Sequence, residues 1–514
     1  MSTALSSRAN NVGAPQAVRW SLGAVSVFLV LFVLSHLFSG TSDGDDTYIY
    51  MQYVRRLLTT GDFTFNLHEP SAGVTSMLWP LLMTPICAIF GTDVVVWKLA
   101  SSISFAAAGV ALYACLCALD IPRIRASLLA ACLALDVLAL RWSGTGMDNG
   151  PADCIVVLAI GLMVMMAYDK SPHPVLFGLV LSLMPFVRPE LVLLSASITM
   201  FAVRCHGLTS SYTVRFVAGG MVAGIIALLA VHLLVGSIVP QTLAAKSISL
   251  KQTDPLHAAK ALTMIVGAGS GIFALAVLFW IVVTKSLGPR QWLLHVIVPV
   301  GLAVLFLAQR NMLVSTRYES YLALPLVVAG IFHIARQIGS VIARAALVLQ
   351  FALAVGVAVF LWPATRTSDG EDIRRVTAGF SQKVPPGARV ALTEVGAFGF
   401  YSHWYIIDLV GLVDRRSLAY LEAHGRPRSD DELDEMLFRR GATHYVNMLP
   451  KDRNAVVIEH TCLRLTPVAS GSVERNILDS GGYTSKSLWV IYEITYRMDS
   501  SAPRCAYLRS VRSL

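Results

Sequence analysis

Charged residues are scarce in this chain. Asp, Glu, Lys and Arg make up 14% of its 514 residues and hydrophobic residues make up 55%, whereas roughly 25% of an average protein is charged. The mean hydropathy is +0.63. The basic residues behind the net charge of +9 are dispersed among apolar segments instead of clustered with aromatic residues, which argues against nucleic-acid binding. We therefore expect a polytopic α-helical membrane protein that contacts lipid.

Cysteines and histidines show no spacing typical of a zinc site. Six of the eight cysteines lie in or beside apolar segments, where we expect them to act as small hydrophobic residues. Only Cys462 and Cys505 lie in the C-terminal part. An oxidising compartment would let these two pair, and the sequence leaves both a disulfide and two free thiols open.

The chain also lacks the internal repeats that transporters often carry, and no small-residue cleavage site follows its first apolar segment. We expect that segment to be a retained signal anchor. Twelve apolar segments are long enough to cross a bilayer, or to do so with short flanks. They are residues 18–38, 76–91, 94–119, 124–141, 151–168, 174–187, 190–203, 215–236, 261–284, 291–308, 320–335 and 345–363.

Basic residues between these segments predict the topology in a cytoplasmic (inner) membrane. The positive-inside rule places Lys170, Arg204, Lys285 and Arg336 in the cytoplasm. The loops at 41–75, 142–150, 237–260 and 309–319 and the chain after residue 363 then lie on the other side. A cytoplasmic start and an outer end require an odd number of crossings. We therefore expect 11 or 12 membrane helices, with one element between residues 76 and 141 broken or re-entrant.

The composition changes at about residue 363. Residues 364–514 hold 20 of the 41 Lys and Arg and 18 of the 32 Asp and Glu, which is the composition of a soluble domain. Strand-like segments at 389–393, 405–410 and 443–448 and a charged helix at 430–440 predict an α/β domain. The expected organisation is a cytoplasmic tail (1–17), a transmembrane domain (18–363) with an outer loop at 41–76, and an extracytoplasmic α/β domain (364–514).

Two adjacent carboxylates, Asp45 and Asp46, begin the outer loop. A charged Asp at the bilayer centre costs roughly 2.5 to 3.5 kcal/mol on insertion scales, so we place the pair at the membrane surface. Asp46, Tyr50 and Tyr53 have helical spacing, and Asp45 and Gln52 follow it on an adjacent stripe, which predicts a short amphipathic helix lying on the membrane. The carboxylates are then either a helix cap favoured by the helix dipole or a general base that meets a lipid-borne substrate.

Short motifs spread over most of the chain resemble those of the GT-C glycosyltransferases, especially the branch with the mycobacterial terminal arabinofuranosyltransferases. Asp148 stands where that branch usually has Glu, and Gln241 where it usually has Asn. The motifs are Asp45-Asp46-Thr47-Tyr48-Ile49, Gly61 to Asn66, Gly73 to Trp79, Gly146-Met147-Asp148, Arg188-Pro189-Glu190, Pro240-Gln241-Thr242 with Lys246, Arg317-Tyr318, Gly396 to Gly399, and Ile407 to Leu412.

The resemblance implies inverting transfer of a sugar from a polyprenyl-phosphate donor on the outer membrane face. This reaction needs a carboxylate base and a cation for the departing phosphate. We expect Asp45 or Asp46 to be the base, with Asp45 slightly favoured because its stripe carries polar partners. Candidates for the donor phosphate are Arg55, Arg56, Lys246 and Arg317. Candidates for sugar or acceptor contacts are Tyr48, Trp79, Asp148, Arg188 and Glu190.

Simpler interpretations of these residues stay open. The cations could be interfacial side chains, the aromatic residues could be membrane anchors, and Arg188 could pair with Asp148 or Glu190. No cofactor is assigned, and a divalent metal held by Asp148 with the aspartate pair is left open.

The substrates are less constrained than the reaction. Arabinofuranose is the first choice of sugar, with a hexose or an aminosugar as the alternative, and the acceptor is a glycan, a lipid-linked glycan or a secreted protein. A flippase or transporter of lipid-linked sugars and a polyprenyl-binding scaffold are the competing functions.

Overall fold

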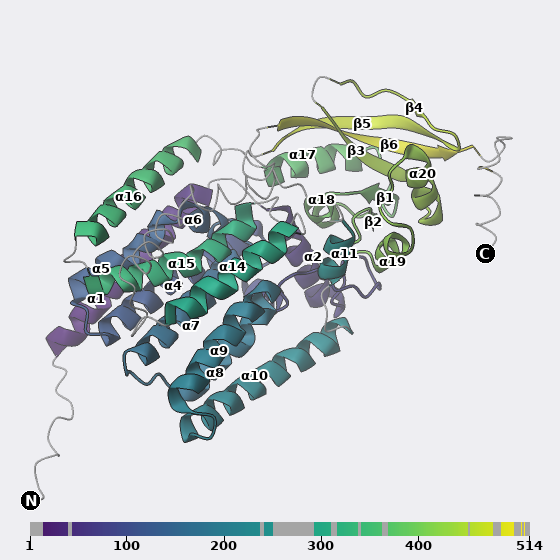
Figure 1. The fold of residues 1–514 in the computed structure, drawn as a ribbon. Coiled ribbons are helices and arrows are strands. Elements are labelled where there is room, and N and C mark those ends of the chain that lie inside the picture. Colours follow the sequence, from purple (N-terminus) through teal and green to yellow (C-terminus); the bar gives the residue numbers. More distant parts are fainter. Residues whose placement is uncertain are drawn as a thin grey trace, which may run out of the picture.

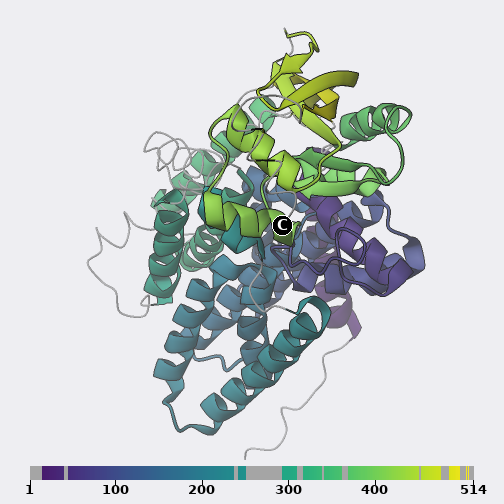
Figure 2. The same cartoon turned by 90° about the vertical axis from the view of Figure 1, so that its right-hand side faces the viewer.

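The computed structural model describes residues 14–39, 44–236, 241–249, 292–309, 316–337, 341–361, 369–450, 453–475 and 485–497, together with Cys505 and Leu508. A helical part, α1 to α16, carries at one end a smaller part of sheet and helices, α17 to β6 (Figure 1; Figure 2). The change of architecture falls close to residue 363, where the composition changes.

Among the residues that the structure describes, four helices are long and apolar enough to cross a membrane: α1 (Ala14–Ser39, through its segment Leu22–Ser39), α4 (Val94–Ala118), α7 (Asn149–Ala167) and α10 (Ser211–Val235). The other large apolar helices are α3 (Leu78–Phe90), α8 (Pro174–Val187), α9 (Val192–His206), α14 (Leu294–Gln309), α15 (Thr316–Gln337) and α16 (Val341–Leu361). Many apolar side chains of α10 are exposed, Leu233 to 81%, as expected of a helix in contact with lipid. The expected span at 261–284 lies outside the described residues.

One apolar segment between residues 76 and 141 is broken, which confirms that expectation. Residues 123–143 form α5 (Arg123–Ala131), the 3₁₀ turn η1 (Cys132–Leu135) and α6 (Val137–Ser143). The Asp136 carboxylate accepts a hydrogen bond from the Ala139 N–H (3.0 Å) and so caps α6. A second break follows α8, where Arg188 is extended and precedes η2 (Pro189–Leu191), because a proline disfavours helical backbone in the residue before it.

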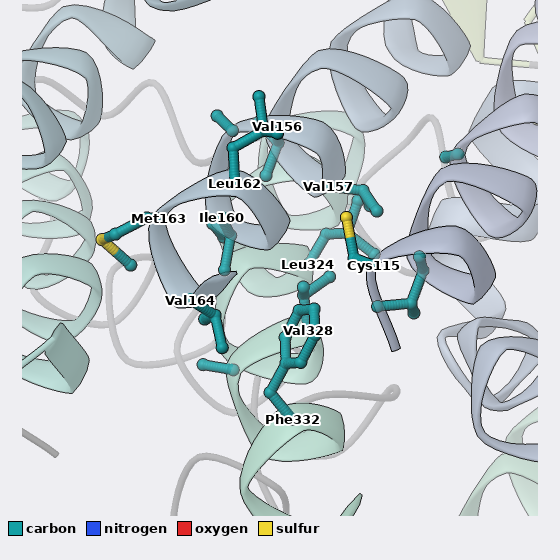
Figure 3. Close-up of a cluster of buried hydrophobic side chains, with 14 of the residues drawn as sticks. Cys115, Val156, Val157, Ile160, Leu162, Met163, Val164, Leu324, Val328 and Phe332 are labelled. Atoms are coloured by element: carbon teal, nitrogen blue, oxygen red, sulfur yellow. The ribbon is translucent and has the colours of Figure 1, made fainter. Parts of the chain in front are cut away.

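The core of the helical part is apolar and closely packed. Cys115 of α4, Val157 of α7, and Val328 and Phe332 of α15 meet there (Figure 3). Gly109 of α4 has no room for a side chain, since a Cβ would lie 2.1 Å from Leu31 Cδ1 of α1. Small residues at such points let helices approach closely in membrane proteins.

The C-terminal part is built on a six-stranded mixed sheet with the strand order β2-β1-β3-β6-β5-β4. β1 pairs in parallel with β2 and β3, whereas the other pairs are antiparallel. The strands are β1 (Arg389–Leu392), β2 (Tyr405–Asp408), β3 (His444–Pro450), β4 (Ile458–Glu459), β5 (Leu463–Arg475) and β6 (Ser485–Tyr496), and the helices are α17 (Asp369–Ser381), α18 (Val395–Tyr401), α19 (Arg415–His424) and α20 (Asp430–Arg439). The three expected strands and the charged helix are confirmed, whereas the long β5–β6 pair was not predicted.

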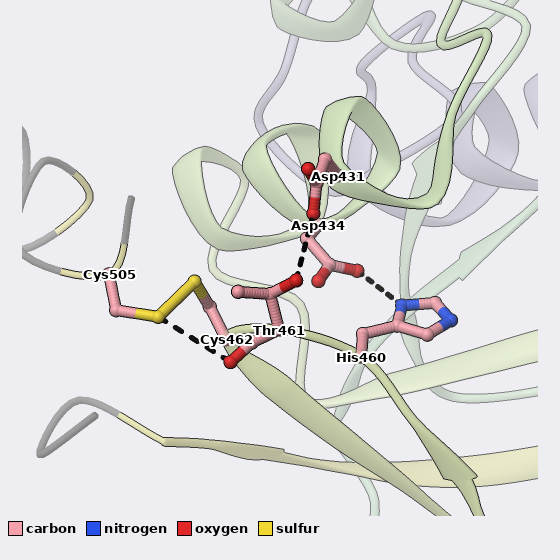
Figure 4. The surroundings of a disulfide bond; sticks show 6 residues. All are labelled: Asp431, Asp434, His460, Thr461, Cys462 and Cys505. Carbon is pink, nitrogen blue, oxygen red and sulfur yellow. Dashed lines mark hydrogen bonds and ion pairs between the residues drawn. A yellow bond between two sulfur atoms is a disulfide. The ribbon is translucent and has the colours of Figure 1, made fainter. Parts of the chain in front are cut away.

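Cys462 and Cys505 form a disulfide, which answers the question that the sequence left open (Figure 4). Their Cα atoms are 5.4 Å apart, within the usual range. Beside the disulfide, His460 Nδ1 and the Asp434 carboxylate of α20 are 2.6 Å apart. The bond therefore ties Cys505 to the beginning of β5.

Candidate active site

The two carboxylates begin α2 (Asp45–Thr60), the helix expected in the outer loop. The helix ends at Gly61, whose φ of 78° lies in the left-handed region that favours glycine. Residues 47–54 are buried, because α2 lies between the helical part and α18 (Figure 1). The expectation of a helix lying on the membrane surface is corrected: the apolar faces of α2 are covered by protein.

One face of α2 borders a small cleft. Asp46, Ile49 and Tyr50 line it from α2, at the spacing that puts residues on one helix face. The rest of the lining comes from three other segments, namely Gly73, Val74 and Thr75 of the outer loop, Thr242 of α11 (Gln241–Ser249), and Leu412 of the C-terminal part. The cleft thus combines a carboxylate with hydroxyl groups where the two parts of the chain meet.

Asp45 lies on a different face of α2 and contacts the C-terminal part. Its carboxylate oxygens accept hydrogen bonds from the backbone N–H groups of Gly396 (2.9 Å) and Ala397 (2.8 Å) in the first turn of α18. Burial, followed by the nearby Glu394 carboxylate, raises the pKa of Asp45 to about 7, although both hydrogen bonds act to lower it. Asp45 is therefore a cap, but of α18 and not of its own helix.

A buried ion pair lies behind the cleft. The Tyr50 hydroxyl donates to Asp148 Oδ2 (3.2 Å) and accepts from the Ser76 N–H (3.2 Å). Arg188 donates to Asp148 Oδ1, and the two residues are 1% and 0% exposed. Of the two pairings considered for Arg188, the structure has the one with Asp148, while Glu190 is partly buried on η2. The pair holds Tyr50, so direct acceptor contact by Asp148 or Arg188 is not what the geometry supports.

Two aromatic residues expected at the sugar lie in the core instead. Tyr48 is 1% exposed and packs on Phe400 and Tyr401, with ring centroids 5.8 and 5.2 Å away. Trp79 is 3% exposed, and its Nε1–H donates to the Gly146 carbonyl (3.1 Å). Neither ring lines the cleft, so the structure adds no support to the sequence interpretation of both as sugar-stacking or membrane-anchoring residues. Burying a large ring with its polar group satisfied stabilises the interface between segments.

The four candidate cations for the donor phosphate lie on different elements. The Arg55 guanidinium lies 4.2 Å from the centroid of the Phe400 ring and donates to the Gln52 side chain. Burial, followed by the adjacent Arg56, lowers the pKa of Arg55 to about 10. Neither arginine lines the cleft. Lys246 is on α11 and Arg317 is in the first turn of α15, and the side chains of both lie outside the described part of the chain.

Sequence reasoning missed how much of the site comes from the contact between the two parts. The Asn66 side chain forms two hydrogen bonds with the backbone of Ile406 in β2, donating to its carbonyl (2.8 Å) and accepting from its N–H (3.0 Å). At Gly73, a Cβ would lie 2.6 Å from the Tyr53 hydroxyl and 2.9 Å from the Leu412 carbonyl oxygen. The only signal in the sequence was that both residues lie in the outer-loop motifs.

The structure assigns no metal to this site. Among the residues that it describes, no group of three or more His, Cys, Asp or Glu side chains has an arrangement that could hold a metal ion. The metal therefore stays unassigned.

Comparisons with known proteins place the fold. Residues 365–484 match a family model described as a domain of unknown function (DUF8728), and no curated protein matches the sequence. The crystal structure of ArnT from Cupriavidus metallidurans bound to undecaprenyl phosphate is similar over 92% of this chain and 98% of that chain, with 11% identity and a TM-score of 0.55.

Two further structures are similar over 92% of this chain. The apo crystal structure of the same ArnT has 12% identity and a TM-score of 0.52, with 98% of that chain covered. The cryo-EM structure of the mycobacterial arabinofuranosyltransferase AftD has 15% identity and a TM-score of 0.44, with 39% of that chain covered. ArnT is a GT-C glycosyltransferase. The likeness to ArnT confirms the expected architecture of apolar helices followed by a sheet domain, and this chain is a membrane protein with the GT-C fold.

Proposed function

We propose that this protein is a glycosyltransferase that moves a sugar from a polyprenyl-phosphate donor to an acceptor hydroxyl. The observation that carries the proposal is the position of Asp46, which lines a cleft between the outer loop, α11 and the C-terminal part of a GT-C fold. The structure of ArnT, which shares this fold, contains undecaprenyl phosphate. This ligand supports a polyprenyl phosphate as the carrier of the sugar.

In the proposed reaction, the acceptor oxygen attacks the anomeric carbon of the donor sugar. The bond from that carbon to the phosphate oxygen breaks, polyprenyl phosphate leaves, and the configuration is inverted. Asp46 takes the proton of the acceptor hydroxyl as general base. Asp46 is the better candidate because it lines the cleft, whereas Asp45 faces α18, from which its carboxylate accepts two backbone hydrogen bonds.

Lys246 is the favoured cation for the departing phosphate. Thr242 lines the cleft from α11, and Lys246 follows it by four residues on the same helix, a spacing that places two residues on one helix face. A lysine acts as a point charge on phosphate. Arg317 at the beginning of α15 is the second candidate, whereas the described contacts of Arg55 hold it against Phe400.

We place the cleft and the C-terminal part on the extracytoplasmic side of the inner membrane. The distribution of Lys and Arg among the loops supports this topology. The disulfide between Cys462 and Cys505 also supports it, because disulfides persist in oxidising compartments and are rare in the cytosol. For the sugar, arabinofuranose stays the first choice because of the outer-loop resemblance, with a hexose or an aminosugar as the alternative and a glycan, lipid-linked glycan or secreted protein as acceptor.

The test is a transfer assay with purified protein in detergent, radiolabelled polyprenyl-phosphate sugars and membrane acceptors. We expect transfer from one donor, and a loss of about 10²- to 10⁴-fold in the Asp46→Asn variant, as is typical for removal of a general base, with donor binding retained. Asp62→Asn is the matched control, since Asp62 lies in the same outer loop but does not line the cleft. Transfer from no donor, or full activity of Asp46→Asn, would refute the proposal. Movement of intact donor across a vesicle membrane without release of polyprenyl phosphate would identify a flippase instead.

A further inference from the structure

The first turn of α18 is capped by a residue from another part of the chain. The residue at its own cap position, Glu394, makes no side-chain capping hydrogen bond, while the N–H groups of Gly396 and Ala397 both donate to Asp45. The first N–H groups of any helix lack partners within the helix. Asp45, 351 residues away in sequence from Gly396, supplies the acceptors here.

This contact has no spare room. A Cβ at Gly396 would lie 2.0 Å from the backbone oxygen of Asp45 and 2.8 Å from its carboxyl carbon. Real Cβ atoms do not approach other atoms so closely, so a side chain at this position would displace the first turn of α2. The neighbouring turn of α18 is equally close to the outer loop, because a Cβ at Gly399 would lie 2.3 Å from the Phe65 ring.

Asp45 and Asp46 are consecutive residues of the same helical turn, and they point about 100° apart because a helix has about 3.6 residues per turn. Asp45 faces α18 while Asp46 faces the cleft. Any shift of the first turn of α2 toward or away from α18 therefore moves Asp46 relative to the cleft. Misplacement of a reacting group by about 1 Å can cost about 10²-fold in rate.

We propose that Asp45 is a positioning residue: its two hydrogen bonds to α18 fix the first turn of α2, so that the C-terminal part determines where Asp46 meets the acceptor. This inference rests on the proposed function, in which Asp46 is the general base. It makes the C-terminal part a component of the catalytic centre and not a separate module.

The chemistry of the side chain at position 45 supports a role beyond packing. Each N–H group of α18 donates to a different oxygen of Asp45, and an amide in the same place would turn a donor group toward one of them. The pKa of Asp45 is raised to about 7, first by burial and then by Glu394 at the cap of α18, with Asp46 on α2 adding to the effect. The two N–H groups of α18 act in the opposite direction and stabilise the charged form.

The experiment combines Asp45→Asn, Gly396→Ala and the double variant, with Gly379→Ala of α17 as control because a Cβ there meets nothing within 4 Å. Transfer kinetics give kcat and the donor KM. Hydrogen–deuterium exchange reports on residues 46–50 and 395–398. We expect each single variant to lower kcat about 10- to 100-fold at an unchanged donor KM, and to speed exchange in both segments. The double variant should lower kcat no further than the more impaired single variant does, because both changes break the same contact.

Two results would overturn the inference. If Gly396→Ala leaves kcat intact while Asp45→Asn abolishes transfer, Asp45 acts on the substrate directly and is not a positioning residue. If exchange in residues 46–50 is unchanged in both variants, the contact with α18 does not position α2. The exchange result stands even if the wild-type protein transfers no sugar, so it separates this inference from the proposed function.

Discussion

The buried pair of Asp148 and Arg188 makes the most quantitative prediction about this protein. The two residues are 0% and 1% exposed, and Tyr50 hydrogen-bonds to the same carboxylate. Removing one partner of a buried ion pair leaves an uncompensated charge and typically destabilises by about 3 to 5 kcal/mol. Asp148→Asn keeps the shape and an acceptor for Tyr50, and Arg188→Met keeps much of the side-chain length, so each removes mainly the charge.

The corresponding change in melting temperature follows from the chain length. An unfolding entropy of about 2.1 cal/mol/K per residue gives roughly 1 kcal/mol/K for a chain of this size, so each single variant should melt about 3 to 5 °C lower. Removing both charges leaves no unpaired ion, so the double variant should melt closer to wild type than either single variant. Thermal unfolding of the purified protein in detergent, followed by intrinsic fluorescence, measures all of these values.

A matched control comes from an exposed pair. Lys170 and Asp120 form an ion pair of 2.9 Å, with side chains 43% and 82% exposed, and such pairs contribute about 0 to 1 kcal/mol. Asp120→Asn should therefore leave the melting temperature within about 1 °C of wild type. Single variants at the buried pair that melt like this control, or a double variant that loses the sum of both single effects, would refute the reasoning.

Of three further predictions, two concern the contact between the two parts of the chain and one concerns the disulfide within the C-terminal part. The pKa of Asp45, about 7, lies above its ordinary value of 3.8, so the folded state binds this proton more tightly and the contribution of Asp45 to stability falls as the pH rises from about 4 to about 7. The Asp45→Asn variant does not titrate there, so its melting temperature relative to wild type should rise between about pH 4 and pH 7. A difference that is constant with pH would contradict this. Asn66→Ala removes both hydrogen bonds to Ile406 and should destabilise the protein by about 1 to 3 kcal/mol for each backbone group left without a partner. The loss should be visible as faster hydrogen exchange in β2. Unchanged exchange there would show that the contact is dispensable. Replacing Cys462 and Cys505 by serine removes a disulfide that links positions 43 residues apart and should destabilise the C-terminal part by up to about 4 kcal/mol. Chemical denaturation measures this loss. Unfolding at the same denaturant concentration as wild type would mean that the disulfide does not constrain the unfolded chain.

Much of the fold was predictable because it follows from local sequence patterns. A broken element between residues 76 and 141 was expected because the topology requires an odd number of crossings, and it is seen within residues 123–143 as α5, η1 and α6. Strands β1, β2 and β3 were expected from short apolar segments. The long β5–β6 pair was missed because residues 463–475 mix Pro, Gly, Ser and charged residues, a composition that weakens the strand signal.

The candidate site was predicted only in part. Helical spacing correctly put Asp45 and Asp46 on different stripes of one helix, but the polar partners beside Asp45 favoured it as the base. In the structure, the polar side chains of this stripe meet other parts of the protein: Gln52 donates to the Phe65 carbonyl of the outer loop, and Asp45 caps α18 of the C-terminal part. A polar stripe predicts that a helix face meets polar groups, and it does not distinguish a substrate from the protein itself.

The sequence by itself determined the membrane class, the change of architecture near residue 363, and the presence of a carboxylate helix in the outer loop. These properties depend on composition and on periodicity within about 20 residues, which is the scale of one membrane helix. Only the tertiary structure decided which carboxylate lines the cleft, which acid pairs with Arg188, and that Tyr48 and Trp79 lie in the core. Each of these outcomes depends on contacts between residues distant in sequence, such as Asp45 with Gly396, and no local pattern encodes them.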